Sequence, residues 1–126
     1  NVKESPGRVT FDIVYSGSFD GPTSVVEHYE LTPDALKLSV ELPDYSGPVR
    51  MQWPVLSDNG AEKTRITVDG EKVRVALGER SNAFTVNGAT RVQVDETPYG
   101  CRNGFARVAI AEFAAGEKPT LIIRPE

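Results

Sequence analysis

Residues 36–42 read Leu-Lys-Leu-Ser-Val-Glu-Leu, and no other part of the chain identifies its secondary structure so clearly. Hydrophobic side chains occupy every second position, and polar ones stand between them. Successive side chains of a β-strand point to opposite sides, so this pattern predicts a strand with one face in a core and the other in water. Residues 49–55, Val-Arg-Met-Gln-Trp-Pro-Val, repeat it. Because no useful length of sequence has the helical spacing i, i+3, i+4, i+7, we expect an all-β protein.

Glycine-containing dipeptides separate several of the predicted strands. Asp69-Gly70 stands between the alternating runs 66–68 and 73–75. Asn87-Gly88 stands between the runs 84–86 and 92–94. Each dipeptide predicts a tight antiparallel hairpin, because glycine supplies the positive φ angle that such a turn needs.

The complete pattern predicts ten short strands. They are expected near 8–16, 25–31, 35–42, 48–55, 64–69, 72–77, 83–86, 90–95, 105–113 and 120–124. One open sheet rarely carries so many, so we expect a two-sheet antiparallel β-sandwich, with a closed barrel as the alternative. Strand 105–113 is nearly all apolar on both sides, which favours a central position covered on both faces, or a contact with a neighbouring domain.

Length and composition limit the classes of function. The 126 residues are enough for a single domain, 1–126. The net charge is -4 with both signs spread along the chain, and nucleic acid would need a dense basic face. The sequence contains no run of about 20 apolar residues, so no membrane span is predicted. Asn1 is not an initiator Met and no signal region follows, so we expect a piece of a larger protein, joined to it at 1–7 and 124–126.

Few residues offer chemistry. Cys101 is the only cysteine and His28 the only histidine, so neither a disulfide nor the usual zinc cluster is expected, and we predict no cofactor. The adjacent carboxylates Asp95 and Glu96 are a weak signal for Ca²⁺. His28 could serve as a general base beside Glu30 or Tyr29, but a polar residue on the outer face of a strand is the favoured interpretation.

Aromatic residues in or beside loops are candidates for stacking on sugar rings. They are Phe19, Tyr45, Trp53 and Tyr99. Trp53 has the phase of Met51 and Val55 and is therefore expected in the core. Tyr45 and Tyr99 are better candidates for exposure, although each could instead fold back over the edge of the core.

The segment 97–104, Thr-Pro-Tyr-Gly-Cys-Arg-Asn-Gly, is the densest cluster of functional residue types. Arg102 could clamp the carboxylate of an acidic sugar, with Asn103 beside it. The alternative is a structural one, because two glycines suit a long connection between strands. The candidate ligand-binding residues are thus Tyr45, Tyr99, Arg102 and Asn103, and no catalytic or metal-binding residue is assigned.

Residues 27–40, Glu-His-Tyr-Glu-Leu-Thr-Pro-Asp-Ala-Leu-Lys-Leu-Ser-Val, form a strand, a turn and a second strand. Residues 116–124 place a turn before Thr-Leu-Ile-Ile-Arg. These segments resemble the β-sandwich modules appended to bacterial polysaccharide lyases and glycoside hydrolases, particularly the C-terminal domains of heparinase II/III-like enzymes. In such families catalysis resides in a separate helical domain, and no catalytic residue carries over to this chain.

The resemblance implies a non-catalytic accessory module of a periplasmic or secreted glycan-processing protein. Its partners would be the catalytic domain of the same polypeptide and, in addition, polysaccharide. The alternative is an immunoglobulin-like structural or adhesin domain of a bacterial surface protein. A large apolar patch on one side would favour the accessory module, whereas charge on every outer face would favour the structural domain.

Overall fold

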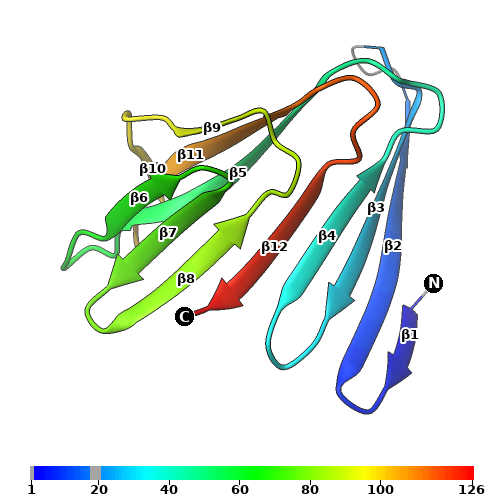
Figure 1. The fold of residues 1–126 in the computed structure, drawn as a ribbon. Helices are drawn as coiled ribbons and strands as arrows, with labels where there is room; N and C mark the ends of the chain where they lie inside the picture. The colour runs from blue at the N-terminus through cyan, green and yellow to red at the C-terminus, as the bar shows by residue number, and fades with distance from the viewer. Residues whose placement is uncertain (1, 18–20) are drawn as a thin grey trace.

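The computed structural model describes residues 2–17 and 21–126, and all its regular elements are strands (Figure 1). The strands are β1 (Val2–Ser5), β2 (Arg8–Ser16), β3 (Ser24–Leu31), β4 (Leu36–Glu41), β5 (Val49–Asp58), β6 (Arg65–Asp69), β7 (Lys72–Leu77), β8 (Arg80–Thr85), β9 (Arg91–Val94), β10 (Tyr99–Cys101), β11 (Gly104–Phe113) and β12 (Thr120–Pro125). No helix in the described chain is long and apolar enough to cross a membrane.

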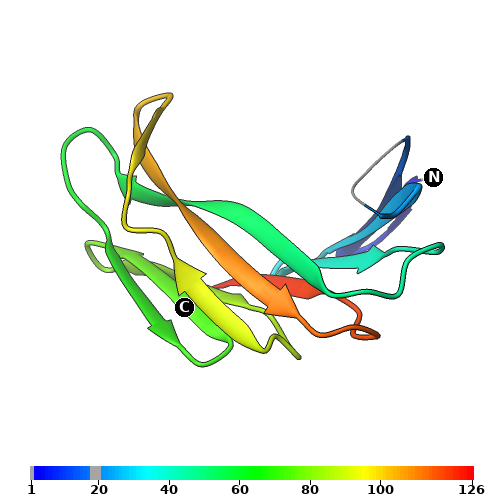
Figure 2. The same cartoon turned by 90° about the horizontal axis from the view of Figure 1, so that it is seen from above.

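The strands form two antiparallel sheets. The larger sheet has the order β1-β2-β3-β4-β12-β8-β7-β6. In the smaller sheet β11 lies between β5 on one side and β10 and β9 on the other. The all-β fold with two sheets is confirmed, and the larger sheet has free edges, so the barrel alternative is wrong. Seen from above, the smaller sheet lies over one part of the larger sheet, and β1 and β2 lie well to the side (Figure 2).

The core lies only where the two sheets overlap. It is built by Trp53 and Val55 of β5, Ala109, Ala111 and Phe113 of β11, and Val73, Val86 and Leu121 from the larger sheet and its connections. Every hydrophobic residue that is buried in the described chain lies between Trp53 and Leu121. Strands β1 to β4 contribute none. The prediction that Trp53 is a core residue is confirmed, and its ring packs on Phe84 with 6.2 Å between centroids.

The hairpin predicted at Asp69-Gly70 is confirmed. β6 and β7 pair with Ile66 opposite Val75 and Val68 opposite Val73. Gly70 has a φ of 57° and is the first of the two residues that connect the strands. A positive φ at this position is what the favoured hairpin turns require.

The hairpin predicted at Asn87-Gly88 is wrong. β8 pairs with β7 and β12 in the larger sheet, whereas β9 pairs with β11 in the smaller one. A tight turn is present, since Ala89 N donates to Val86 O at 3.2 Å. Among the described residues a positive φ occurs at Gly88 (85°) but not at Asn87. That combination belongs to a type II turn, which splays the flanking strands, so the chain passes from one sheet to the other.

Two strands were missed, which makes twelve where about ten were expected. Residues 2–5 of the expected junction segment pair with β2 as β1. Residues 99–101 of the expected loop pair with β11 as β10. β11 has the predicted central place within its sheet, but its second face, with Val108 and Ile110, is only half-buried and no described strand covers it.

Candidate functional site

The first four strands place their hydrophobic side chains on one side of the larger sheet. In the register of β2, β3 and β4, Phe11 lies opposite Tyr29, which lies opposite Leu38. Residues two positions apart on a strand lie on the same face of the sheet. We call this surface the open apolar face; it comprises Val9, Phe11, Ile13, Tyr15, Val25, Glu27, Tyr29, Leu31, Leu36, Leu38 and Val40.

Beyond its inner border, no described strand covers the open apolar face, in which three residues are exposed and the other eight are half-buried. Ile13 is 37% exposed, Leu31 40% and Tyr15 44%. At its inner border Leu38 packs against the core of the sandwich. The face is thus the core-facing side of the larger sheet, continued beyond the place where the smaller sheet ends. An apolar sheet surface of this kind is typical of sites that another protein, a membrane or a ligand covers.

The centre of the face is aromatic. The rings of Phe11 and Tyr29 stack with 4.7 Å between centroids and 11° between planes. Stacked aromatic pairs contribute about 0.5–1.5 kcal/mol beyond the area that they bury. The two rings therefore form a stacked pair across β2 and β3.

Glu27 is the one charged side chain that the register places on this side of β2 to β4. A hydrogen bond with Glu27 raises the pKa of the Tyr15 hydroxyl. Burial, followed by the charge of Glu27 and a hydrogen bond with it, raises the pKa of Tyr29. The two tyrosine hydroxyls and Glu27 are thus the polar groups of an otherwise apolar side of these strands.

A groove runs along the inner border of the face. It has a volume of about 560 Å³ and lies between β3 and β4 on one side and the start of β5 on the other. Val25, Leu38 and Val40 form one wall, and Arg50 and Gln52 are among the residues of the other.

The opposite side of the same strands is mostly polar, apart from Val14, which is 62% exposed and lies opposite Val26, and His28 lies at its centre. Its Nδ1 is 2.6 Å from Asp12 Oδ1, and its Nε2 is 3.0 Å from Glu41 Oε2. Hydrogen bonds with Glu41 and then Asp12 raise the pKa of His28. Both ring nitrogens can donate to carboxylates only in the protonated ring, so the arrangement favours imidazolium.

This geometry favours a structural role for His28. The expected position on an outer strand face is confirmed, although its partners are Asp12 and Glu41, not Glu30 or Tyr29. Ser39 lies directly opposite His28 on β4. Both ring nitrogens are nevertheless directed at carboxylates and not at that hydroxyl. The cluster ties β2, β3 and β4 together and keeps this side of the sheet hydrophilic.

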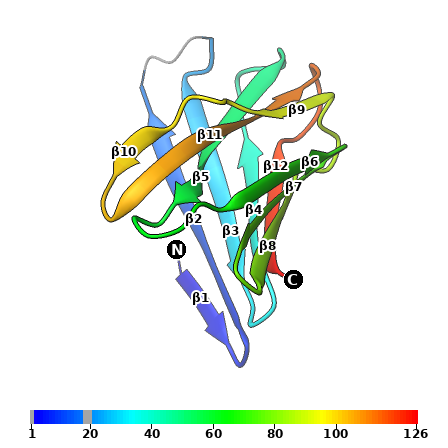
Figure 3. The same cartoon turned by 90° about the vertical axis from the view of Figure 1, so that its left-hand side faces the viewer.

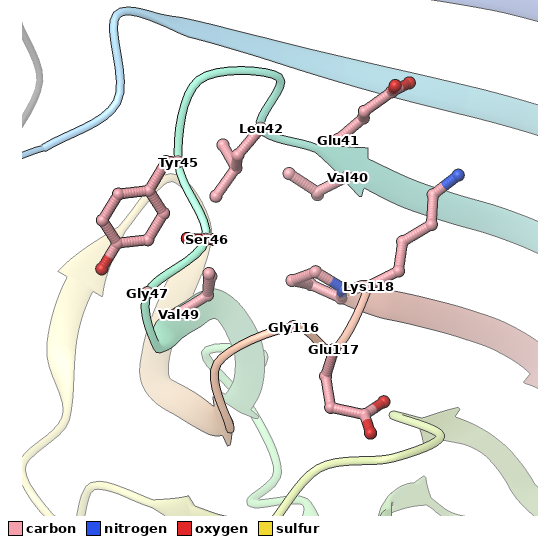
Figure 4. A pocket seen from close by; sticks show the side chains of 11 residues that line it. Val40, Glu41, Leu42, Tyr45, Ser46, Gly47, Val49, Gly116, Glu117 and Lys118 are labelled. Atoms are coloured by element: carbon pink, nitrogen blue, oxygen red, sulfur yellow. The ribbon is translucent and has the colours of Figure 1, made fainter.

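Tyr45 lies in the connection between β4 and β5. It is half-buried, and its hydroxyl donates to Pro48 O at 2.8 Å. Its ring fills the space beside Gly47, where even a Cβ atom would collide with it. A hollow of about 280 Å³ lies between this connection and the segment Gly116–Pro119 (Figure 4). Tyr45 is therefore folded back on its own loop.

The other three candidate residues lie on the hairpin of β10 and β11. Tyr99 is 43% exposed in β10, and Arg102 and Asn103 form the exposed turn. Asn103 has a φ of 68°, which asparagine tolerates better than most residues.

The structure does not bring the four candidate residues together. The hairpin flanks the end of β5, where Asp58 pairs with Phe105, whereas Tyr45 precedes its start at Val49. A ten-residue strand spans about 33 Å. Figure 3 shows β10 at the far end of β11 from the chain that leads into β5. Phe19, the fourth aromatic candidate, lies outside the described residues.

In the described part of the chain, no group of three or more His, Cys, Asp or Glu side chains is placed to hold a metal ion. Asp95, one of the two carboxylates considered for Ca²⁺, accepts a hydrogen bond from Thr97 N at 3.1 Å. Its main-chain oxygen accepts one from Arg107 Nε at 2.7 Å. These contacts give Asp95 a local structural role in the turn that follows β9.

Sequence reasoning did not single out the open apolar face. Alternation in β2 to β4 indicated which side chains share a face, but not that the smaller sheet ends before it covers them. The available signal was the segment 8–16, where Val9, Phe11, Ile13 and Tyr15 alternate with mostly polar residues. No protein-family model and no curated protein matches this chain, so the assignment of its function rests on the geometry of the site.

Proposed function

We propose that this chain is a non-catalytic accessory module that docks on a neighbouring protein domain through the open apolar face. The observation that carries the proposal is the distribution of buried residues. All of the described core lies between Trp53 and Leu121, while β2 to β4 carry a contiguous apolar surface without a covering layer. A neighbouring domain would supply that layer.

The contrast between the two sides of β2 to β4 supports docking from one side only. The outer side carries the His28 cluster and the ion pair of Arg8 with Glu30, at 2.7 Å. The other side has Glu27 as its single charge. An immunoglobulin-like spacer domain would carry charge on every outer face, so this asymmetry favours the accessory module over the structural alternative.

The neighbouring domain would be the catalytic domain of the same polypeptide, in a secreted or periplasmic glycan-processing protein. His28, the only imidazole of the chain, is held between two carboxylates, which supports a role without catalysis. The isolated chain is accordingly expected to have no lyase or hydrolase activity on polysaccharides.

Direct contact with carbohydrate is a second candidate function, favoured by the exposure of Tyr99 and Arg102 on one hairpin. Calorimetric titration with neutral and acidic oligosaccharides would test it. Weak binding that is lost in the double variant Tyr99→Ala, Arg102→Ala would support this site, and binding that survives in the double variant would contradict it.

Docking is tested by expressing this chain and the adjoining domain of its gene product separately and measuring their association by calorimetry. Tyr29→Asp places a second carboxylate in the open apolar face and should weaken binding at least about tenfold, which corresponds to about 1.4 kcal/mol.

The matched control is Thr10→Asp, which adds a carboxylate to the same part of the sheet but on its outer side, since Thr10 alternates with Phe11. It should bind like the wild type. Equal binding by wild type and Tyr29→Asp, or a gene product without a further folded domain, would contradict the proposed function.

A further inference from the structure

Strand β5 is an edge strand of the smaller sheet, and the geometry of its partner shows which of its main-chain groups are free. Val108 O accepts from Asp95 N, and Glu112 O accepts from Thr90 N, both at 2.8 Å. These carbonyls of β11 therefore point away from β5. Pro54 lies opposite Val108, and Arg50 lies opposite Glu112.

In an antiparallel pair, positions that do not exchange hydrogen bonds alternate with those that do. The main-chain groups of Arg50 and Pro54 must then point to the outer edge of β5, together with those of Gln52 midway between them. The position of Pro54 agrees with this, since proline in a sheet occurs where no N–H is needed for the ladder.

The free edge is limited to the first part of β5. Beyond Pro54, Thr64 closes it, because Thr64 Oγ1 donates to Leu56 O at 2.6 Å and Thr64 N donates to Ser57 O at 2.9 Å. Among the described strands, only β11 pairs with residues 49–54. The open run therefore offers two N–H donors, of Arg50 and Gln52, and three carbonyl acceptors.

This open edge and the open apolar face border the same groove. Arg50 and Gln52 line it from β5, and Leu38 and Val40 line it from β4. A strand added to a sheet lies about 4.8 Å from its neighbour, and packed sheets are about 10 Å apart. A strand placed beside β5 would consequently extend the smaller sheet over β4 and β3.

We propose that the neighbouring domain docks by adding an extended strand to β5. This inference rests on the proposed function and specifies how docking occurs. A helix or a loop could cover the apolar wall, but it would leave the donors and acceptors of Arg50 and Gln52 buried without partners. An added strand satisfies both requirements, as in other cases of β-strand addition.

The same geometry defines the chemistry of the added strand. Every second side chain would point toward Val25, Leu38 and Val40 and should therefore be apolar, except that one beside Glu27, which also lines the groove, should be a hydrogen-bond donor or a cation. The intervening side chains would continue the outer side of the smaller sheet, where Arg50 and Glu112 lie 3.6 Å apart, and should be polar. The partner is thus a strand of about four residues or more in which apolar and polar side chains alternate. Its main chain would bond mostly to the main-chain groups of Arg50 and Gln52.

The variant Gln52→Pro tests this proposal because it removes the N–H at the centre of the free edge. Its side chain is directed to the outer side of the sheet, and proline is tolerated at the equivalent outward position 54. Gln52→Ala is the matched control, since it shortens the same side chain but keeps the N–H. In the association experiment, Gln52→Pro should bind at least about tenfold more weakly than Gln52→Ala.

Amide hydrogen exchange on the wild-type complex gives a second measurement that does not depend on the folding of a variant. Binding should slow exchange at Arg50 and Gln52 at least tenfold, to rates typical of paired strands. Unchanged exchange at these two amides, or equal binding by Gln52→Pro and Gln52→Ala, would overturn strand addition. If strand addition were overturned in this way but Tyr29→Asp still weakened binding, the proposed function would stand. Binding that is insensitive to Tyr29→Asp would instead refute docking through the open apolar face.

Discussion

His28 links the stability of β2, β3 and β4 to pH. Its pKa is raised in the folded protein by Glu41 and Asp12, so folding is favoured most when the ring is protonated. The stabilisation is complete below the ordinary pKa of about 6.5 and is lost as the pH rises through the higher pKa of the folded state.

We therefore expect His28→Asn to destabilise the protein more at about pH 5.5 than at about pH 9. Urea unfolding of the wild type and the variant at both pH values measures this difference. Ser39→Ala, a non-titrating change opposite His28, should show the same small effect at both. A destabilisation by His28→Asn that does not depend on pH would contradict the carboxylate-bound imidazolium.

Trp53 is the largest side chain of the core, and its indole N–H has no hydrogen-bond partner. Trp53→Ala should lower the free energy of unfolding by about 3–5 kcal/mol. Trp53→Phe should cost much less, because it keeps most of the packing and removes an unsatisfied donor. Tryptophan emission in the native protein should be blue-shifted and move to longer wavelength on unfolding, and native emission at the wavelength of free indole would contradict burial.

These two residues show what sequence reasoning can and cannot resolve. The burial of Trp53 follows from its phase with Met51 and Val55 alone, and so does the outer position of His28. The partners of His28 come from β2 and β4, and only strand pairing reveals them. Strand pairing also reveals that the candidate residues Tyr45 and Tyr99 lie far apart. Tyr45 precedes the start of β5, whereas Tyr99 lies on the hairpin that flanks its end.

Gly104 begins β11 at the irregular pairing between β5 and β11. It has a φ of 157°, and a Cβ atom would collide with the main-chain oxygen of Asp58. Gly104→Ala should therefore destabilise the protein by roughly 1–3 kcal/mol, measured as a lower midpoint of urea unfolding. Gly100→Ala is the control on the same hairpin, since a Cβ there would meet no atom within 4 Å. Equal stability of the two variants would contradict the close approach of Gly104 and Asp58.

The two glycine turns explain why strands were easier to predict than their arrangement. Asp69-Gly70 and Asn87-Gly88 both belong to the dipeptides that predict hairpins, yet only the first joins neighbours in one sheet. The two turns differ in the position of the glycine. Gly70 is the first of the two central residues of its turn, whereas Gly88 is the second of its turn, and there the flanking strands diverge. Such a dipeptide indicates that the chain turns. Whether the flanking strands pair depends on whether both join the same sheet.

In the whole molecule, the same limitation applies to the open apolar face. Alternation over 8–16 and 25–42 predicts a sheet with one apolar side, and this part of the fold was accessible from the sequence. Whether that side is covered depends on the width of the second sheet. The smaller sheet covers the larger sheet only from β6 to the border of β4. Strands β2 and β3 therefore retain an apolar surface that a self-sufficient sandwich would bury.

The proposal that this surface is a docking site is tested most directly by hydroxyl-radical footprinting of tyrosines. Oxidation of Tyr15 and Tyr29 would be compared in the isolated chain and in the full natural gene product, with Tyr99 on the distant hairpin as the internal reference. We expect oxidation of Tyr15 and Tyr29 to fall several-fold in the full product while that of Tyr99 is unchanged. Equal oxidation of Tyr15 and Tyr29 in the two proteins would contradict docking through the open apolar face.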